Sequence, residues 1–419
     1  MIFLTVSGGP YGLEPLLSYA GKHGALILLL LTPLMWDVPT IFVVMELNSM
    51  MPVTGGYYQW VKRALGLRCA WYEGWWTWLY TFVDLAIYPV LFVQYASFFF
   101  PQIAEFKIPI CLVIIWISAG LNILGIVPVG RISTILSAAV VLSFIILFAI
   151  YFFYSGSSLH VPSASLNGIH YSALGMGLYT VMWNFLGWDN TTTYAEEVNK
   201  PVRTYLISTA IAFALTLVVY LFAVIVALSS GISLDLLKEE GFPALGSFVG
   251  GHWLGLIIAV GGMASTLGLF SAVLLSVSRV PKVMADDHLL PAKLHVLHPK
   301  FNTPYVSIIA CALVVSGMIF WTFGDLLIID VTLYGAALFL EFVSLVIFRI
   351  RLPDEKRPFK IPLGIPGLCT LMLFPIGVYS IALTSAFSLE SKMWIPALFA
   401  LSALVSAEVV WRIIVWRNQ

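Results

Sequence analysis

Two short stretches of this chain combine helix-breaking residues with polar groups inside long apolar segments. The first is 7–12 (SGGPYG) and the second is 183–189 (WNFLGWD). Glycine and proline interrupt a regular helix, and Asn and Asp are weak helix formers. A broken helix presents free N–H groups at one half-helix end and free carbonyls at the other. The two stretches therefore predict a site for a small molecule that carries a carboxylate, an ammonium group or both.

Acidic residues inside apolar segments form a second set of candidates, because charge within a bilayer is costly and needs a reason. Nearly all Lys and Arg lie at loops or segment ends, so these acids must be protonated, hydrated, or matched by a cationic substrate or ion. We expect Glu14 and Asp189, which flank the breaks, to couple protons or bind a cation. Asp84 lies one turn before Tyr88 on the same helix face. For the others the alternatives are helix capping or hydrogen bonding (Asp37, Asp330) and interfacial or packing positions (Glu341, Glu408).

The composition says which elements must position these residues. Of the 419 residues, 60% are hydrophobic and only 10% are charged, whereas soluble domains carry about 25% charged residues. The mean hydropathy is +0.96. The net charge is +0 and the four cysteines lack metal-ligand spacing. We therefore expect a multi-pass membrane protein in a lipid bilayer, with no nucleic-acid partner, no metal and no cofactor.

A helix needs about 20 apolar residues to cross the bilayer core, and the chain offers twelve such segments with only short polar links. The prediction is one all-α membrane domain over 1–419 with no soluble appendage. The breaks fall in the first and sixth segments, at matched positions of two five-segment units, which indicates an inverted repeat. The repeats would be 1–154 and 171–348, with two peripheral helices in 366–416. The segments are 1–20, 24–47, 69–100, 108–125, 132–154, 171–194, 204–230, 252–277, 305–323, 326–348, 366–387 and 393–416.

Orientation follows from the basic residues, which collect in cytoplasmic loops. With twelve spans, every Lys and Arg falls on one side except Lys22, Lys107, Lys238 and Lys392. We therefore expect both termini in the cytoplasm, in a plasma membrane or a bacterial inner membrane. The tryptophans Trp71, Trp75, Trp76 and Trp78 fit a belt at the membrane interface.

Six motifs in order resemble those of the amino acid–polyamine–organocation permeases, and within them the plant-type polyamine and amino acid uptake group. The resemblance covers essentially the whole chain. The motifs are 6–14 (VSGGPYGLE), 52–58 (PVTGGYY), 84–92 (DLAIYPVLF), 183–189 with 195–201 (AEEVNKP), 286–291 (DDHLLP) with 298–304, and 357–362 (RPFKIP).

The resemblance implies a core of ten helices in a 5+5 inverted repeat, two peripheral helices, and alternating access. It implies that backbone amides at Ser7, Gly8 and Gly9 hold a substrate carboxylate and that Trp183 packs over the substrate. It also implies a proton-sensitive acid at Asp189 and no glycoprotein partner, because the cysteine that such light chains carry after span three is absent. The candidate substrate-binding residues are Ser7, Gly8, Gly9, Tyr11, Asp84, Tyr88, Trp183, Asn184, Gly187 and Trp188.

The predicted function is secondary active transport of amino acids or polyamines, with protons as the expected coupling ion. The alternatives are an exchanger or facilitator for neutral amino acids and a nutrient sensor that binds without transport. Gln94 stands where the plant-type group usually has an acid, which weakens the case for a polyamine over an amino acid. An enzyme is not expected, because the chain has neither G-x-S-x-G nor H-E-x-x-H.

Overall fold

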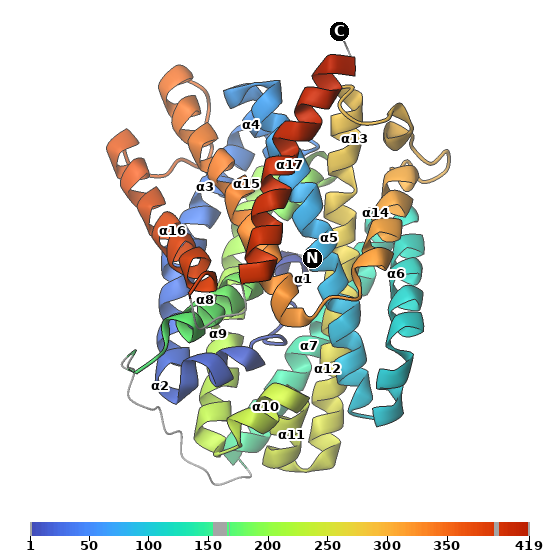
Figure 1. Ribbon diagram of the computed structural model, residues 1–419, viewed down its shortest axis with the longest axis vertical. Helices are drawn as coiled ribbons and strands as arrows, with labels where there is room; N and C mark the ends of the chain where they lie inside the picture. The colour runs from blue at the N-terminus through green and yellow to red at the C-terminus, as the bar shows by residue number, and fades with distance from the viewer. Residues whose placement is uncertain (1, 154–165, 167, 389–393, 418–419) are drawn as a thin grey trace.

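The computed structural model describes residues 2–153, 166, 168–388 and 394–417, and side chains up to Trp416. Lys392, which entered the orientation argument, lies outside this part, as does the side chain of Arg417. The regular structure of the described residues is helical apart from an isolated bridge between Thr54 and Tyr194. Most long helices run between the two ends of the molecule (Figure 1).

Within the described residues, nine helical segments are long and apolar enough to cross a membrane. The difference from the twelve predicted segments has a structural cause. The segments predicted at 1–20 and 171–194 are interrupted, and the one at 305–323 contains a helix of only 14 residues. The helices are α1 (Ile2–Val6), α2 (Glu14–Thr32), α3 (Val38–Met50), α4 (Gly56–Leu65), α5 (Leu67–Ser97), α6 (Lys107–Ile123), α7 (Ile126–Phe153), α8 (Tyr171–Asn184), α9 (Pro201–Ser230), α10 (Leu234–Glu240), α11 (Phe242–Gly250), α12 (His252–Val277), α13 (Arg279–Asp286), α14 (Tyr305–Met318), α15 (Phe323–Arg351), α16 (Ile365–Ala386) and α17 (Trp394–Arg417).

The helix α2 contains a sharp turn at Gly21, whose φ of 66° and ψ of −177° are not helical. A side chain is strained at such a φ, and glycine avoids this strain. The turn joins the predicted first and second segments, so that residues 14–20 and the helix that follows run in different directions. Beyond Thr32 the path continues through a π-helical stretch, Pro33–Asp37, into α3.

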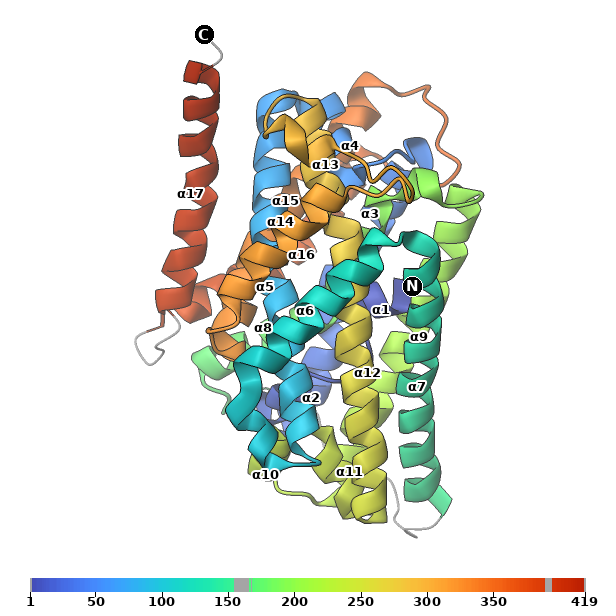
Figure 2. The same ribbon diagram turned by 90° about the vertical axis from the view of Figure 1, so that its right-hand side faces the viewer.

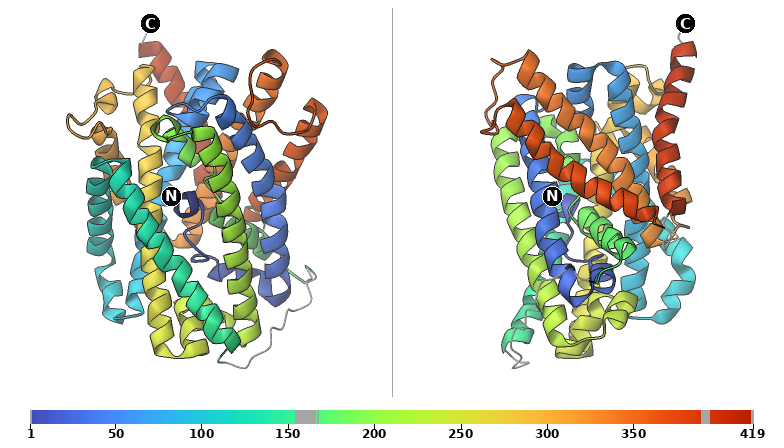
Figure 3. Two further views of the ribbon diagram at one scale, coloured as in Figure 1. Left: turned by 180° about the vertical axis from the view of Figure 1, so that it is seen from behind. Right: turned by 60° about the vertical axis from the view of Figure 1, so that its left-hand side comes forward.

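The interior is built around α5, which packs against both α12 and α15. The helix α1 lies about halfway between the two ends of the molecule (Figures 1 and 3). At one end, α4, α13 and the link from α15 to α16 carry many of the basic residues, and we call it the basic end. The short helices α10 and α11 lie at the opposite end.

The tryptophans at the start of α5 pack against the C-terminal helix α17, which stands at one side of the molecule (Figure 2). The indole N–H of Trp71 donates to the carbonyl of Ala407 at 2.8 Å. Trp76 donates to the carbonyl of Leu404 at 3.0 Å, and Trp75 to the hydroxyl of Ser406 at 2.9 Å. A helix more than 300 residues away in sequence therefore receives these three side chains. The interface belt stays a prediction.

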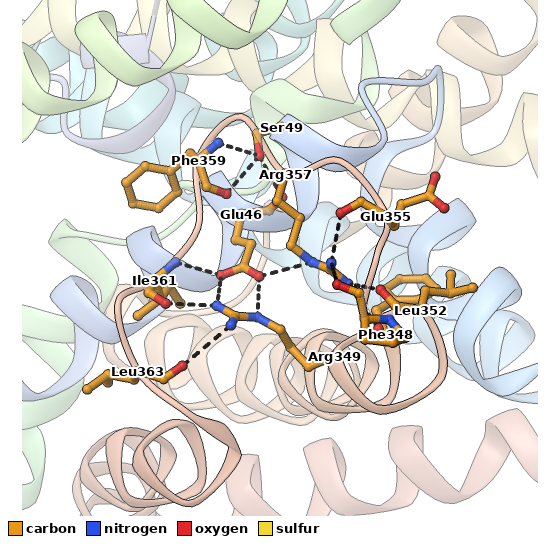
Figure 4. A network of polar contacts seen from close by, with 11 residues as sticks. Glu46, Ser49, Phe348, Arg349, Leu352, Glu355, Arg357, Phe359, Ile361 and Leu363 are labelled. Carbon is orange, nitrogen blue, oxygen red and sulfur yellow. Dashed lines mark hydrogen bonds and ion pairs between the residues drawn. The ribbon is translucent and has the colours of Figure 1, made fainter.

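At the basic end, a buried ion-pair network ties α3 to α15 and to the link between α15 and α16 (Figure 4). Glu46 on α3 is fully buried. Arg349 on α15 contacts both of its carboxylate oxygens, Nε at 2.5 Å and Nη2 at 2.6 Å. The backbone N–H of Ile361 donates to Glu46 at 2.8 Å, and Nε of Arg357 lies 3.4 Å from it. The sequence motif 357–362 therefore serves here to close one end of the bundle.

Candidate functional site

Both predicted helix breaks are present. The first separates α1, which ends at Val6, from α2, which begins at Glu14. Gly8, Gly9 and Gly12 take φ values of 60°, 96° and 91° there. The second follows Asn184 at the end of α8, and the chain then runs through two short 3-10 turns, Asn190–Thr193 and Ala195–Glu197, before α9 begins.

Tyr220 on α9 joins the two breaks, and the sequence did not identify it. Its hydroxyl lies 3.1 Å from the carbonyl of Ser7 and 2.9 Å from the hydroxyl of Ser7. The same hydroxyl lies 3.0 Å from the carbonyl of Asn184. The side-chain amide of Asn184 in turn donates to the carbonyl of Gly12 at 3.2 Å. The two interruptions therefore form one hydrogen-bonded unit.

The first break already satisfies the amides that were expected to hold a carboxylate. The N–H groups of Ser7 and Gly8 donate to the carbonyl of Phe3 at 2.9 and 3.1 Å. The N–H of Gly9 donates to the hydroxyl of Ser7 at 3.1 Å. In this conformation a substrate carboxylate would have to displace these contacts.

Asp84, Tyr88 and Trp183 come together between the second break and α5. The hydroxyl of Tyr88 lies 2.7 Å from each carboxylate oxygen of Asp84. The indole N–H of Trp183 donates to Oδ1 of Asp84 at 3.1 Å. The expected pairing of Asp84 with Tyr88 across one helical turn is thus present, and Trp183 brings the second break into the same site.

A second carboxylate, Asp330 on α15, lies within electrostatic range of Asp84 and Tyr88. Asp330 is fully buried, and no described residue forms a hydrogen bond with either of its oxygens. An ion is costly in a low-dielectric interior unless a charge or donors compensate it. We call Asp84 and Asp330 the central carboxylates.

Trp183 contacts two residues that line a pocket of about 220 Å³, whose walls come from the first break and from α2, α5, α8, α10 and α15. Its ring packs edge-on against Phe323, with centroids 5.5 Å apart. A Cβ on Gly12 would approach Cζ3 of Trp183 to 2.6 Å. Both Phe323 and Gly12 line the pocket, so the indole lies between the pocket and Asp84.

Glu14 lines the same pocket and joins three neighbouring segments by hydrogen bonds. Its carboxylate accepts from the N–H of Gly12 at 2.6 Å, the hydroxyl of Tyr95 at 3.2 Å and the N–H of Phe242 at 3.3 Å. These donors come from the first break, from α5 and from α11. Glu14 is therefore a buried carboxylate with three donors, and it ties the break to the end of the molecule opposite the basic end.

Asp189 lies on the other side of the second break, toward the basic end. The hydroxyl of Tyr334 on α15 donates to it at 2.8 Å. Tyr80 on α5 donates to the neighbouring Asn190 at 2.9 Å, and the Tyr80 and Tyr334 rings meet edge to face with centroids 5.2 Å apart. These two tyrosines separate Asp189 from the central carboxylates along α5 and α15.

The comparison with known proteins decides what kind of protein carries this site. Residues 1–402 match the family model described as amino acid permease. The chain belongs to this family. Its activity is membrane transport rather than catalysis of a reaction.

The permease has relatives in plants and bacteria. It is 32% identical over 382 residues to the polyamine transporter RMV1 of Arabidopsis thaliana, covering 90% of this chain and 76% of that protein. It is 30% identical over 380 residues to the polyamine transporter PUT1 of Oryza sativa subsp. japonica, covering 90% and 70%. It is also 30% identical over 213 residues to the uncharacterized transporter Rv1999c of Mycobacterium tuberculosis, covering 48% and 46%.

Three predicted site residues of the permease lie away from the central carboxylates. Trp188 donates to Asp37 at 3.2 Å and packs against Phe213 of α9. Tyr11 donates to the carbonyl of Ile258 on α12 at 2.7 Å. Gly187, at φ 89°, lies against Asn190 and the carbonyl of Thr5. Each of them supports the backbone of a break in this conformation.

Two buried acids of the permease, Glu46 and Glu73, were missed in the sequence because both lie near the ends of predicted segments, 24–47 and 69–100. Glu408 forms ion pairs with Arg68 at 2.7 Å and Arg412 at 2.8 Å, which suits the interfacial position expected of it. Glu341 is instead fully buried near Asp189. Among the described residues, no group of three or more His, Cys, Asp or Glu side chains is arranged to hold a metal ion.

Proposed function

We propose that the permease transports aliphatic amines, with polyamines as the preferred substrates, through a site at the central carboxylates. The observation that carries the proposal is the pair Asp84 and Asp330. Both are buried, and in the described part of the chain neither forms an ion pair with Lys or Arg. A substrate ammonium group would supply the missing positive charge.

The surroundings of Asp84 suit an amine. The aromatic rings of Tyr88 and Trp183 lie beside the carboxylate, with centroids 6.2 Å apart, and aromatic faces attract ammonium groups. The Ser7 to Gly9 amides are engaged within the first break, which disfavours a substrate that depends on its carboxylate. The polyamine transporters among the relatives point to the same substrate class.

Transport by alternating access would use Trp183 as the barrier between the pocket and Asp84. In the described conformation, contacts between the segment before α4 and the chain after the second break close the basic end. The N–H of Gly55 donates to the carbonyl of Thr193 at 2.8 Å, and Thr54 donates to Glu196 at 2.6 Å. Arg279 pairs with Glu197 at 3.1 Å. These contacts would have to separate for release.

The membrane topology belongs to the same proposal. Twelve spans with a 5+5 inverted repeat would place both breaks at matched positions. The basic end would face the cytoplasm, with both termini on that side. Protons are the proposed coupling ion, because buried Asp and Glu side chains serve as proton carriers in membrane transporters. Glu14 and Asp189, on either side of the central carboxylates, are the proposed carriers.

Uptake into proteoliposomes tests the proposal. Labelled putrescine, arginine and leucine are supplied separately, with and without an inward-directed proton gradient. The proposal predicts accumulation of putrescine that depends on the gradient and is not competed by leucine. Preferred uptake of leucine would replace it with a neutral amino acid exchanger, and saturable putrescine binding without uptake or counterflow would indicate a sensor.

A further inference from the structure

A second group of buried carboxylates lies between the central carboxylates and the basic end. It consists of Glu73 on α5, Asp189 after the second break and Glu341 on α15, and we call it the inner carboxylate cluster. Glu73 and Glu341 are fully buried and Asp189 is 2% exposed. All three lie within electrostatic range of one another. In the described part of the chain, none of them forms an ion pair with a basic side chain.

The donors near the cluster are too few for three carboxylates. Tyr334 donates to Asp189 at 2.8 Å, and Thr77 donates to Glu73 at 3.3 Å. The Asp189 carboxyl also lies near the backbone N–H groups of Asp189 itself and Asn190, and close enough to Glu341 for the two carboxyl groups to share a proton. Among the described residues, no donor of good geometry reaches one oxygen of Glu73 or either oxygen of Glu341. Three such groups in a low-dielectric interior repel one another unless a cation or protons compensate them.

A neutral polar group also faces the cluster without a partner. The hydroxyl of Tyr57 is fully buried and has no hydrogen-bond partner in the part of the chain that the structure describes. It lies within electrostatic range of Glu73, Asp189 and Glu341. A phenolic oxygen can accept a hydrogen bond from an ammonium group that the carboxylates attract. This unpartnered hydroxyl is a second observation, besides the carboxylates, that favours binding of a donor at the cluster.

The cluster is separated from the central carboxylates along the same two helices. Glu73 precedes Asp84 by 11 residues on α5, and Asp330 precedes Glu341 by 11 residues on α15. At 1.5 Å per residue each interval is about 16 Å of helix. The central carboxylates and the inner carboxylate cluster thus form two levels of acidic residues, and the Tyr80 and Tyr334 rings lie between these two levels. An extended tetraamine has terminal nitrogens separated by a distance of this order, whereas a four-carbon diamine is much shorter.

We infer that the inner carboxylate cluster is a second ammonium site, which binds one end of a long polyamine after the Tyr80 and Tyr334 rings have parted. The inference rests on the proposed function, because it concerns how the same path treats substrates of different length. A diamine occupies the two levels one after the other. A tetraamine bridges them and gains affinity from both.

The test compares equilibrium binding of spermine and putrescine to the purified permease in lipid nanodiscs. The variants are Glu73→Gln, Glu341→Gln and their combination, which keep side-chain size and remove charge. Tyr57→Phe is a milder variant that removes only the unpartnered hydroxyl. Glu408→Gln is the control, since Glu408 is an acid outside both levels. Thermal unfolding of each variant verifies folding.

We expect the double variant to raise the Kd for spermine at least about tenfold, which corresponds to the loss of one good ionic contact. The Kd for putrescine should rise less than about twofold. Tyr57→Phe should shift the Kd for spermine in the same direction by a smaller factor. An unchanged spermine Kd in the folded double variant would overturn the inference, and so would an equal loss for both amines. If the unmodified permease binds neither amine, the proposed function itself fails. That result differs from failure of the inference alone, in which the unmodified permease still binds both amines.

Discussion

The indole N–H of Trp183 donates to Oδ1 of Asp84 across 3.1 Å, so that the second helix break is bonded directly to α5. This contact has two consequences. It gives Asp84 a donor that a bound ammonium group could replace. It also holds the indole between the carboxylate and the pocket at Gly12 and Phe323. We therefore predict that an amine that reaches Asp84 from this pocket displaces the Trp183 indole.

Substitution of Gly12 tests the position of Trp183. In Gly12→Ala the new Cβ would lie 2.6 Å from Cζ3 of the indole, so we expect the ring to shift. Misplacement by about 1 Å can cost up to about a hundredfold in rate, and we predict at least a tenfold loss in initial amine uptake. Gly66→Ala is the matched control, because Gly66 has the same φ of 91° and no described residue lies within 4 Å of its Cβ position. Equal effects of the two variants would show that backbone strain, not Trp183, is responsible.

Removal of the Tyr220 hydroxyl tests the link between the breaks. Tyr220→Phe deletes the donor shared by Ser7 and Asn184, leaving buried acceptors unsatisfied at a cost of about 1–3 kcal/mol. We expect a lower unfolding temperature in detergent and slower uptake. Tyr171→Phe, at an exposed hydroxyl that contacts Thr384 at 2.6 Å, should change neither. Unaltered uptake by Tyr220→Phe would mean that the breaks are held together by other contacts.

Neutralisation of Glu46 tests the closure of the basic end. Glu46→Gln leaves the buried guanidinium of Arg349 without its charge partner, and breaking a buried ion pair costs about 3–5 kcal/mol. We predict a large drop in thermal stability, measured by loss of monodisperse protein after heating. Glu408→Gln removes an ion pair at the surface and should have little effect. Similar losses in the two variants would show that the network in Figure 4 does not stabilise the basic end more than a surface ion pair does.

Local chemistry made the breaks and part of the site predictable from the sequence. Glycine and proline in 7–12 interrupt a helix wherever it lies, and the four-residue spacing of Asp84 and Tyr88 puts them on one face. Both features are present in the structure. The membrane class followed from the lack of charged residues.

The remaining features depend on which helices become neighbours, and one sequence does not contain that information. In the sequence Tyr220 looks like any aromatic residue in an apolar helix. In the structure its hydroxyl forms hydrogen bonds with Ser7 in the first break and with Asn184 at the second. Glu46 meets Arg349 only because α3 and α15 lie side by side. The tryptophans of α5 have the spacing of an interface belt, and the sequence gives no sign that α17 is their partner.

The most direct test of the account is binding of putrescine and spermidine to the permease and to Asp84→Asn, with thermal unfolding as the check on folding. We predict that Asp84→Asn remains folded and binds both amines at least about tenfold more weakly, because a charge-assisted contact is lost. If Asp84→Asn binds both amines as tightly as the unmodified chain does, Asp84 is a structural acid and the proposed amine site is wrong.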